Sequence, residues 1–137
     1  MIVLDTNAAV AIAMGTDLGD ALVMLCNPDE CVIAPSFMHA EVAHVMSKYV
    51  RGGYLEVSQA VDCARDALLL VDEFRDDASL WTEALTESLR LGHSSYDLFY
   101  LVLARREGAT LFTLDRKLQK LCDKNGVNAI WLDCDFG

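Results

Sequence analysis

The sequence has 137 residues, the size of one compact domain, so we predict a single domain over residues 1–137. Hydrophobic residues make up 53% of the chain, against 8 glycines and 2 prolines, which excludes disordered and collagen-like classes. The longest apolar runs, 8–14 and 98–104, are too short to cross a bilayer. Asp5 interrupts the apolar N-terminus, and no basic leader precedes it. We therefore expect a cytoplasmic protein without a membrane segment.

The net charge of −10 arises from 11 Lys and Arg against 21 Asp and Glu. Such a charge repels nucleic acid at long range. An active site that gathers carboxylates around metal ions also makes a chain acidic, so the charge does not exclude a nucleic-acid substrate. The five cysteines form no C-x-x-C pair. This pattern favours neither a disulfide framework nor a thiolate zinc site, and we interpret the cysteines as reduced packing residues.

Short apolar runs alternate with longer helical patterns along the first half of the chain. Proline, glycine and capping residues separate these runs and indicate where each element begins and ends. We predict, in order, a strand at 2–4, a helix at 8–14, a helix at 17–26, a strand at 31–34 and a long helix at 36–50.

The second half continues the alternation of helices and strands. We predict a helix at 58–69 capped by Ser58, a weaker strand at 70–74, helices at 76–91 and 95–107, a strand at 110–114, a helix at 115–124 and a strand at 129–132. Apolar strands separated by helices are typical of a parallel sheet that is covered on both faces. We predict a three-layer α/β/α domain with a central parallel sheet of four to five strands.

Two predicted strands end close to an aspartate, Asp5 in one case and Asp115 in the other. Ligands of open parallel sheets bind beyond the carboxyl ends of the strands. Helix capping is an alternative explanation for each aspartate, because a carboxylate that opens a helix accepts hydrogen bonds from its free amides. The sequence leaves both explanations open.

Capping does not explain Glu41 or Asp97. Glu41 lies in the middle of a predicted helix and Asp97 in the first turn of a helix that is apolar all round; neither has Lys or Arg within one turn. A buried ionised carboxylate is strongly disfavoured without a compensating cation. Carboxylates at strand ends and on adjoining helices would form an oxygen-rich site that suits Mg²⁺ or Mn²⁺. The histidines show no zinc-ligand spacing, and we interpret His39 and His44 as ordinary polar or packing residues.

Four segments carry a family resemblance. They are residues 2–7 (IVLDTN), residues 34–36 with 40–42 (APS, AEV), residues 94–104 (SSYDLFYLVLA) and residues 111–118 (LFTLDRKL). In their order and spacing they resemble the PIN domain, and most closely the VapC-type ribonuclease toxins of prokaryotic type II toxin–antitoxin systems. The resemblance covers the whole chain.

This resemblance implies a metal-dependent endoribonuclease that uses one or two Mg²⁺ or Mn²⁺ ions. Its catalytic and metal-binding quartet corresponds to Asp5, Glu41, Asp97 and Asp115. Thr6, Asn7 and Thr113 are expected beside the quartet, with Thr113 positioning a water or a carboxylate. Some members carry a further acid two or three residues after the fourth, where this chain has Lys117 and Leu118. The family also implies an RNA substrate, a homodimer and a cognate antitoxin protein.

Basic residues crowd the last predicted helix beside Asp115, and Arg105 and Arg106 end the helix that carries Asp97. Solvated helix faces explain them, and phosphate contact is the alternative. We expect Arg116 to contact the substrate. Two other functions compete with the nuclease: a catalytically inactive PIN-fold interaction module and a receiver-like Mg²⁺-binding signalling domain. A receiver needs an aspartate after its central strand and a lysine near a later strand end, and the predicted elements supply neither.

Overall fold

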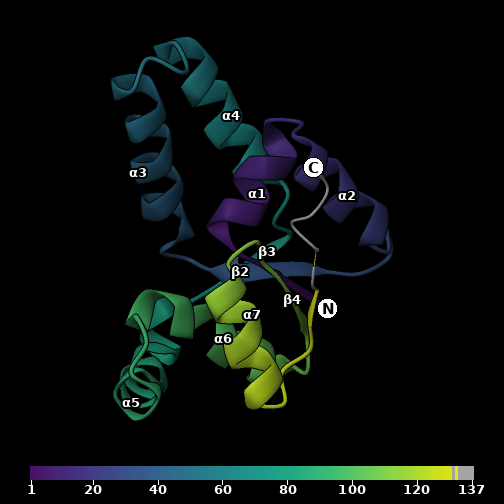
Figure 1. The fold of residues 1–137 in the computed structure, drawn as a ribbon, viewed down its shortest axis with the longest axis vertical. Coiled ribbons are helices and arrows are strands. Elements are labelled where there is room, and N and C mark those ends of the chain that lie inside the picture. Colours follow the sequence, from purple (N-terminus) through teal and green to yellow (C-terminus); the bar gives the residue numbers. More distant parts are fainter. Residues whose placement is uncertain (131, 133–137) are drawn as a thin grey trace.

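The computed structural model describes residues 1–130 and Leu132. Parallel strands form one sheet in the order β3-β2-β1-β4-β5. Their bounds are β1 (Ile2–Leu4), β2 (Val32–Pro35), β3 (Glu73–Arg75), β4 (Thr110–Phe112) and β5 (Ala129–Ile130). Helices lie on both faces of this sheet, which confirms the predicted three-layer α/β/α fold (Figure 1).

Two groups of helices sandwich the sheet (Figure 1). One group comprises α1 (Thr6–Ala13), α2 (Asp17–Leu25), α3 (Met38–Arg51) and α4 (Val57–Leu69). The other comprises the 3₁₀ helix η1 (Asp77–Ser79), α5 (Trp81–Leu91), α6 (Ser95–Glu107) and α7 (Arg116–Lys124). Helices α3 and α4 pack against each other and project from the body of the molecule; we call this hairpin the α3–α4 arm (Figure 1).

Helix α6 is the central helix of the hydrophobic core. Its residues Leu98, Leu101 and Val102 are each 0% exposed, and the helix packs against β1, β2 and β4. Apolar side chains surround the whole helix, as its sequence predicts, because it is covered by the sheet on one side and by α5 and α7 on the other. The first turn of α6, which carries Asp97, is thereby fixed relative to the sheet.

The register of the two central strands brings distant residues together. Leu4 of β1 pairs with Phe112 of β4, and the Asp5 amide donates to the Phe112 carbonyl at 3.2 Å. The residues that follow these strands, Asp5 and Thr113, therefore emerge side by side at the carboxyl edge of the sheet. Receiver domains use the strand order 2-1-3-4-5, so the order found here argues against the receiver-like alternative.

Some predicted boundaries differ from the structure. Helix α4 is capped by Glu56, not by Ser58: Glu56 and Gln59 form a capping box, in which the Glu56 amide donates to Gln59 Oε1 at 2.9 Å. The helix predicted at 76–91 is divided into η1 and α5 because Asp76 caps a separate short turn. The strand predicted at 70–74 lies at 73–75, and the strand predicted at 129–132 ends at Ile130, with residue 131 outside the described residues.

Helices α1 and α2 approach each other closely at Gly19. A Cβ atom at this position would lie 2.1 Å from the Ala11 carbonyl oxygen, so no side chain fits there without moving the backbone. The turn between the helices is held by Thr16, whose hydroxyl accepts from the Gly19 amide at 3.0 Å and donates to the Ala11 carbonyl at 3.1 Å. Glycine is needed at position 19 because there is no room for a side chain. Its conformational freedom is not the reason, since the backbone is helical at this position.

No single helix within the described residues is long and apolar enough to cross a membrane. Helices α1 and α2 meet the criteria of length and composition only as a pair, and that pair is bent by 107°.

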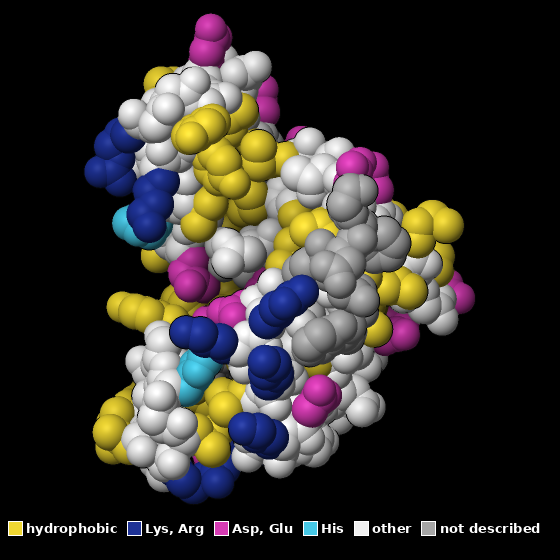
Figure 2. Space-filling model, viewed as in Figure 1, with side chains coloured by type: hydrophobic (Ala, Val, Ile, Leu, Met, Phe, Trp, Pro, Cys, Tyr) yellow, Lys and Arg dark blue, Asp and Glu magenta, His cyan; other side chains and the backbone are white. Residues whose placement is uncertain are grey.

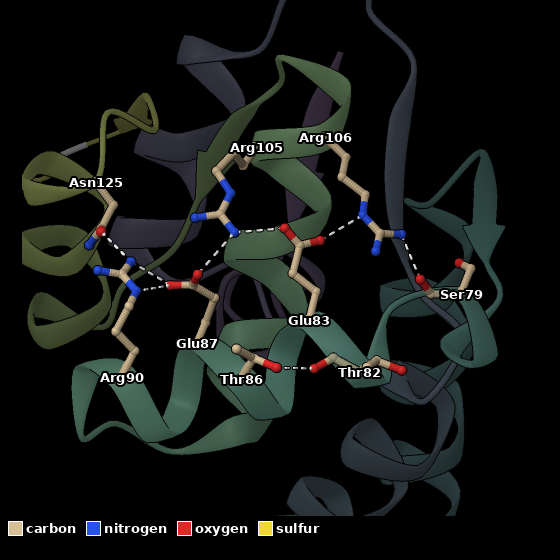
Figure 3. A network of polar contacts seen from close by, with 9 residues as sticks. All are labelled: Ser79, Thr82, Glu83, Thr86, Glu87, Arg90, Arg105, Arg106 and Asn125. Atoms are coloured by element: carbon tan, nitrogen blue, oxygen red, sulfur yellow. Dashed lines mark hydrogen bonds and ion pairs between the residues drawn. The ribbon is translucent and has the colours of Figure 1, made fainter.

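A network of ion pairs joins α5 to α6 (Figure 3). Arg105 Nη2 lies 2.7 Å from Glu83 Oε1 and 3.5 Å from Glu87 Oε1, and Arg106 Nε donates to Glu83 Oε2 at 2.8 Å. Arg106 also donates to the Ser79 carbonyl at 2.6 Å. The sequence left two explanations open for Arg105 and Arg106, a solvated helix face or contact with phosphate. In the structure both arginines bind carboxylates of α5 and hold α5 and α6 together.

Candidate active site

Three acidic side chains line one cavity of about 260 Å³ at the carboxyl edge of the sheet. Asp5 follows β1, Glu41 lies on α3 and Asp97 lies in the first turn of α6. The remaining lining residues are Thr6, Asn7, Val45, Lys48 and Tyr100. Acidic side chains gather in the hollow between the α3–α4 arm and the α6 and α7 helices, with Lys and Arg side chains on both sides (Figure 2).

Asp5 caps a helix and faces the cavity at the same time. Its side chain is buried, and Oδ1 accepts from the Ala8 amide at 2.9 Å, which caps α1. The Thr113 hydroxyl donates to Oδ2. The pKa of Asp5 is raised to about 7, mainly by burial; the hydrogen bonds from Thr113 and Ala8 oppose this rise, and the negative charges of Asp97 and Glu41 add to it. Helix capping and a role in the cavity, which the sequence offered as alternatives for Asp5, are therefore compatible.

Two hydroxyl groups hold Glu41. Tyr100 Oη donates to Glu41 Oε1 at 2.6 Å, and Thr6 Oγ1 donates to the same oxygen at 3.0 Å. Burial raises the pKa of Glu41, the two hydrogen bonds lower it, and the Asp97 charge raises it. Since both bonds fall on Oε1, no described side chain donates to Oε2. This second oxygen is available to a cation or a water.

Asp97 is half-buried and has one side-chain partner, His93. His93 Nε2 lies 2.8 Å from Asp97 Oδ2, and the two residues are four positions apart. The sequence-based prediction considered only Lys and Arg within one turn of Asp97, and a histidine that precedes the helix falls outside both limits. His93 precedes the Ser94 cap of α6 and folds back on the first turn.

Asp115 does not line the cavity in this structure. Its Oδ1 accepts from the Lys117 amide at 2.9 Å and caps α7. Its own amide donates to Thr113 Oγ1 at 3.0 Å. Thr113 thus connects the Asp5 carboxylate with the backbone of Asp115, and the fourth acid of the predicted quartet lies beside the other three without sharing their cavity.

Gln119 supports Thr113 from behind. This glutamine is buried, and its Nε2 donates to the carbonyls of Thr113 at 2.8 Å and of Ile130 at 3.1 Å. The bonds hold the end of β4 against the end of β5. The predicted strand 110–114 ends at Phe112 because Thr113 turns towards Asp5 and Asp115.

The cavity lining includes residues that the sequence predicted and residues that it did not. Thr6 and Asn7 line the cavity as expected, whereas Lys48 and Tyr100 were not predicted as site residues. Lys48 lies seven residues after Glu41, two helical turns along the same face of α3, and this spacing is the signal that could have identified it. Arg116 is the exposed first residue of α7 and does not line the cavity.

The donor set suits a hard divalent cation, because Asp5, Glu41 and Asp97 present carboxylate oxygens to one cavity. Burial and mutual repulsion raise the pKa of Asp5 and Glu41, so a cation at this point would stabilise the ionised forms. Within the described residues, no three Asp, Glu, His or Cys side chains are already grouped as ligands of one ion. Each carboxylate instead binds a neighbour: Asp5 accepts from Thr113, Glu41 accepts from Tyr100, and Asp97 contacts His93.

The fold and cavity define a parallel three-layer α/β domain with carboxylates gathered at the carboxyl ends of its central strands. The model of the PIN domain family matches residues 2–124, and the chain belongs to this family, whose members are generally nucleases. This match confirms the resemblance that the sequence motifs indicated. No curated protein matches the chain.

Two solved structures share the fold. PAE2754 from Pyrobaculum aerophilum superposes with a TM-score of 0.71 at 23% identity, covering 93% of this chain and 82% of that one. VapBC2 from Rickettsia felis, bound to a DNA fragment from its promoter, superposes with a TM-score of 0.64 at 24% identity, covering 97% of this chain and 100% of that one. At these identities the similarity establishes the fold.

Proposed function

We propose that the chain is a metal-dependent endoribonuclease that hydrolyses RNA phosphodiester bonds. The observation that carries this proposal is the convergence of Asp5, Glu41 and Asp97 on one cavity of a PIN domain, at the edge of the sheet where ligands of such folds bind. The retention of these acids in a shared cavity favours an active enzyme over the alternative of an inactive interaction module.

Asp5, Glu41 and Asp97 would hold the Mg²⁺ or Mn²⁺ ion, with Asp115 contributing through water. A bound ion supplies a water of lowered pKa and neutralises charge on the phosphoryl group. Because the Asp115 carboxylate caps α7 and Lys117 stands where some relatives have a further acid, this arrangement favours one ion over two. Hydrolysis by this chemistry would leave 5′-phosphate and 3′-hydroxyl ends.

The chain's own residues orient the reacting groups. Thr113 fixes the Asp5 carboxylate, while Tyr100 and Thr6 fix Glu41 with Oε2 open to the cavity. Burial raises the pKa of Glu41 in the metal-free protein, and a bound cation would oppose this effect by favouring the ionised carboxylate. Arg116, next to Asp115, is proposed to contact a backbone phosphate.

The test is cleavage of an end-labelled pool of cellular RNA by purified protein, with Mg²⁺ or with EDTA. Wild-type protein should cut in Mg²⁺ alone, and Asp5→Asn protein purified in parallel should not cut. This variant also controls for contaminating ribonucleases. Absence of cleavage by the wild type with either Mg²⁺ or Mn²⁺ would contradict the proposal.

We also propose that the chain is the toxin of a toxin–antitoxin pair and forms a homodimer. An apolar groove of about 430 Å³ lies between α3 and α4, and hydrophobic side chains gather on this arm (Figure 2). Its apolar lining includes Met46, Val50, Val57 and Val61. We propose the apolar helices between residues 36 and 69 as the surface for these partners. Growth arrest on expression of the chain, relieved by its neighbouring reading frame, together with a dimeric mass by light scattering, tests this proposal.

A further inference from the structure

The carboxylate cavity is the middle of a longer depression. Val45 on α3 lines this cavity and also lines a hollow on each side of it. One hollow, of about 330 Å³, shares Asn7 and Lys48 with the cavity and is completed by Tyr49 and Tyr54. The other, of about 580 Å³, shares Glu41 and is completed by Phe37, Ala40, His44 and Tyr96. We call this continuous depression along α3 the α3 groove.

An exposed tyrosine is fixed in place at the first end of the groove. Tyr54 is 77% exposed, and a Cβ at Gly52 would lie 2.9 Å from its ring atoms, so the ring rests against the Gly52 backbone. The Tyr54 amide donates to the Tyr49 carbonyl at 2.9 Å, and the two rings meet edge to face with centroids 6.2 Å apart. The turn after α3 thus holds the Tyr54 ring against Tyr49 and Gly52 and presents its outer face to solvent.

A second exposed tyrosine lies at the other end. Tyr96 is 63% exposed, and its ring centroid lies 5.8 Å from that of Phe37. Phe37 also packs against Phe99 at 5.0 Å and against Tyr100 at 5.6 Å. The cluster that supports Tyr96 therefore includes Tyr100, the residue that binds Glu41. Both ends of the groove are structurally tied to the carboxylate site.

Lys48 borders both the carboxylate cavity and the hollow of Tyr54. In the part of the chain that the structure describes, its ammonium group forms no ion pair, although acidic residues line the cavity beside it. An exposed ammonium between an aromatic face and a metal-binding cavity is suited to a backbone phosphate.

We propose that the α3 groove binds one single strand of RNA, with one base stacked on Tyr54, another on Tyr96, and a backbone phosphate on Lys48. The inference rests on the proposed ribonuclease activity and specifies the form of its substrate. Bases of a single strand can turn onto aromatic side chains, whereas those of a duplex are stacked on one another. Stacking also supplies affinity that does not depend on charge, which a protein with a net charge of −10 needs in order to bind RNA.

The test measures the affinity of the whole protein in Mg²⁺ for a short unstructured RNA with phosphorothioate linkages, which resist hydrolysis. Tyr54→Ala and Tyr96→Ala should each weaken binding about fivefold or more, the effect of losing one stacked base. Tyr54→Phe and Tyr96→Phe, which restore the rings, should recover affinity. Trp81→Ala, which removes a 53% exposed aromatic side chain on α5, is the matched control and should bind like wild type.

Two further readouts separate stacking from charge. The same RNA annealed to its complement should bind more weakly, and its affinity should not respond to either tyrosine. Lys48→Gln should reduce the slope of log affinity against log salt by about one, as expected for one lost phosphate contact. Lys124→Gln, at the far end of α7, is its matched control.

Equal affinities of both alanine variants and the Trp81→Ala control would overturn the inference, as would tighter binding of the duplex or no RNA binding by the wild type. Loss of binding to a protein partner without loss of RNA binding would assign the groove to that partner and would also overturn it. Because the RNA resists hydrolysis, the result is independent of cleavage. If the wild type binds RNA through both tyrosines but cuts no RNA, this inference stands and the proposed ribonuclease activity is contradicted.

Discussion

The hydroxyl of Thr113 donates a hydrogen bond to the carboxylate of Asp5, so the residue after β4 orients the acid after β1. The same hydroxyl accepts the amide of Asp115 at 3.0 Å. The pairing of Leu4 with Phe112 makes this contact possible, because it brings the ends of the two central strands into register.

Thr113→Val should therefore impair the metal site while preserving side-chain shape. It removes the bond that lowers the pKa of Asp5 and leaves the Asp115 amide without its acceptor. We expect about 10- to 100-fold weaker Mg²⁺ affinity or cleavage, as for other residues that orient metal ligands. Isothermal titration with Mg²⁺ and cleavage rates provide the measurement. Thr113→Ser, which keeps the hydroxyl, should stay near wild type; equal losses in both variants would point to packing instead.

The metal-free protein should become less stable as the pH rises from about 4 to about 7. The pKa of Asp5 is 3.8 as a free side chain and about 7 in the folded protein, mainly because the group is buried. Between these values the folded state holds a proton that the unfolded state has released, so the free energy of unfolding falls as the pH increases. The full effect is roughly 4 kcal/mol at about 1.4 kcal/mol per pKa unit, and it levels off above about pH 7.

Asp5→Asn removes this charge and should therefore be more stable than wild type above about pH 7 in EDTA, with the gain vanishing near pH 4. The amide oxygen can still accept from Ala8, so the α1 cap is retained. Urea denaturation of both proteins across this range measures the difference. If the variant is instead less stable than wild type above pH 7, the ionised Asp5 carboxylate stabilises the fold even without metal, which would contradict this prediction.

Gly19→Ala should destabilise the protein by about 2 kcal/mol or more, because the new methyl group meets the Ala11 carbonyl oxygen at 2.1 Å. Helix propensity alone predicts the opposite sign, a gain of up to about 1 kcal/mol. Asp20→Ala, on the exposed side of α2, is the control and should change the free energy of unfolding little. Thermal or urea unfolding decides between the two signs.

Arg116→Gln should raise the KM for RNA, whereas Arg106→Gln should leave it unchanged. Arg106 binds Glu83 and the Ser79 carbonyl on α5 and η1 (Figure 3), away from the cavity. Its loss should appear instead as a small decrease in stability, about 1 kcal/mol or less for a partly exposed ion pair. Steady-state kinetics of both variants, normalised to folded protein, make the comparison. An equal rise in KM for both would place the α6 arginines in the RNA path.

The layers of the fold were predictable from local patterns, whereas the contacts of the site were not. Apolar runs such as 2–4 and 110–112 identify strands, and helices between them require a parallel sheet. The strand order and register, which bring Asp5 next to Thr113, depend on packing between segments about a hundred residues apart and leave no local signal. For the same reason the helix pattern around Asp97 does not identify Tyr100 as the partner of Glu41.

Other residues were missed for more specific reasons. His93 lies before the cap of α6, outside the helix in which a partner for Asp97 was sought. Gln119 resembles any polar residue of an amphipathic helix until its bonds to two strand ends are seen. The prediction of Ser58 as the cap was wrong because Glu56 and Gln59 form a reciprocal capping pair that starts the helix two residues earlier. His93 and Gln119 bind neighbours that the local pattern does not contain, whereas the Glu56–Gln59 capping box is itself a local pattern.

The cleavage rates of wild type and Asp97→Asn, measured with Mg²⁺ and with excess EDTA, test whether the carboxylate cavity cuts RNA with a divalent ion. Asp97 is half-buried, and among the described residues its carboxylate has His93 as its one side-chain partner, so the asparagine variant should keep its melting temperature in EDTA. We predict cleavage by wild type in Mg²⁺ and by neither protein in EDTA, with no cleavage by the variant in either condition. Undiminished cleavage by Asp97→Asn, or wild-type cleavage that persists in excess EDTA, would contradict the account.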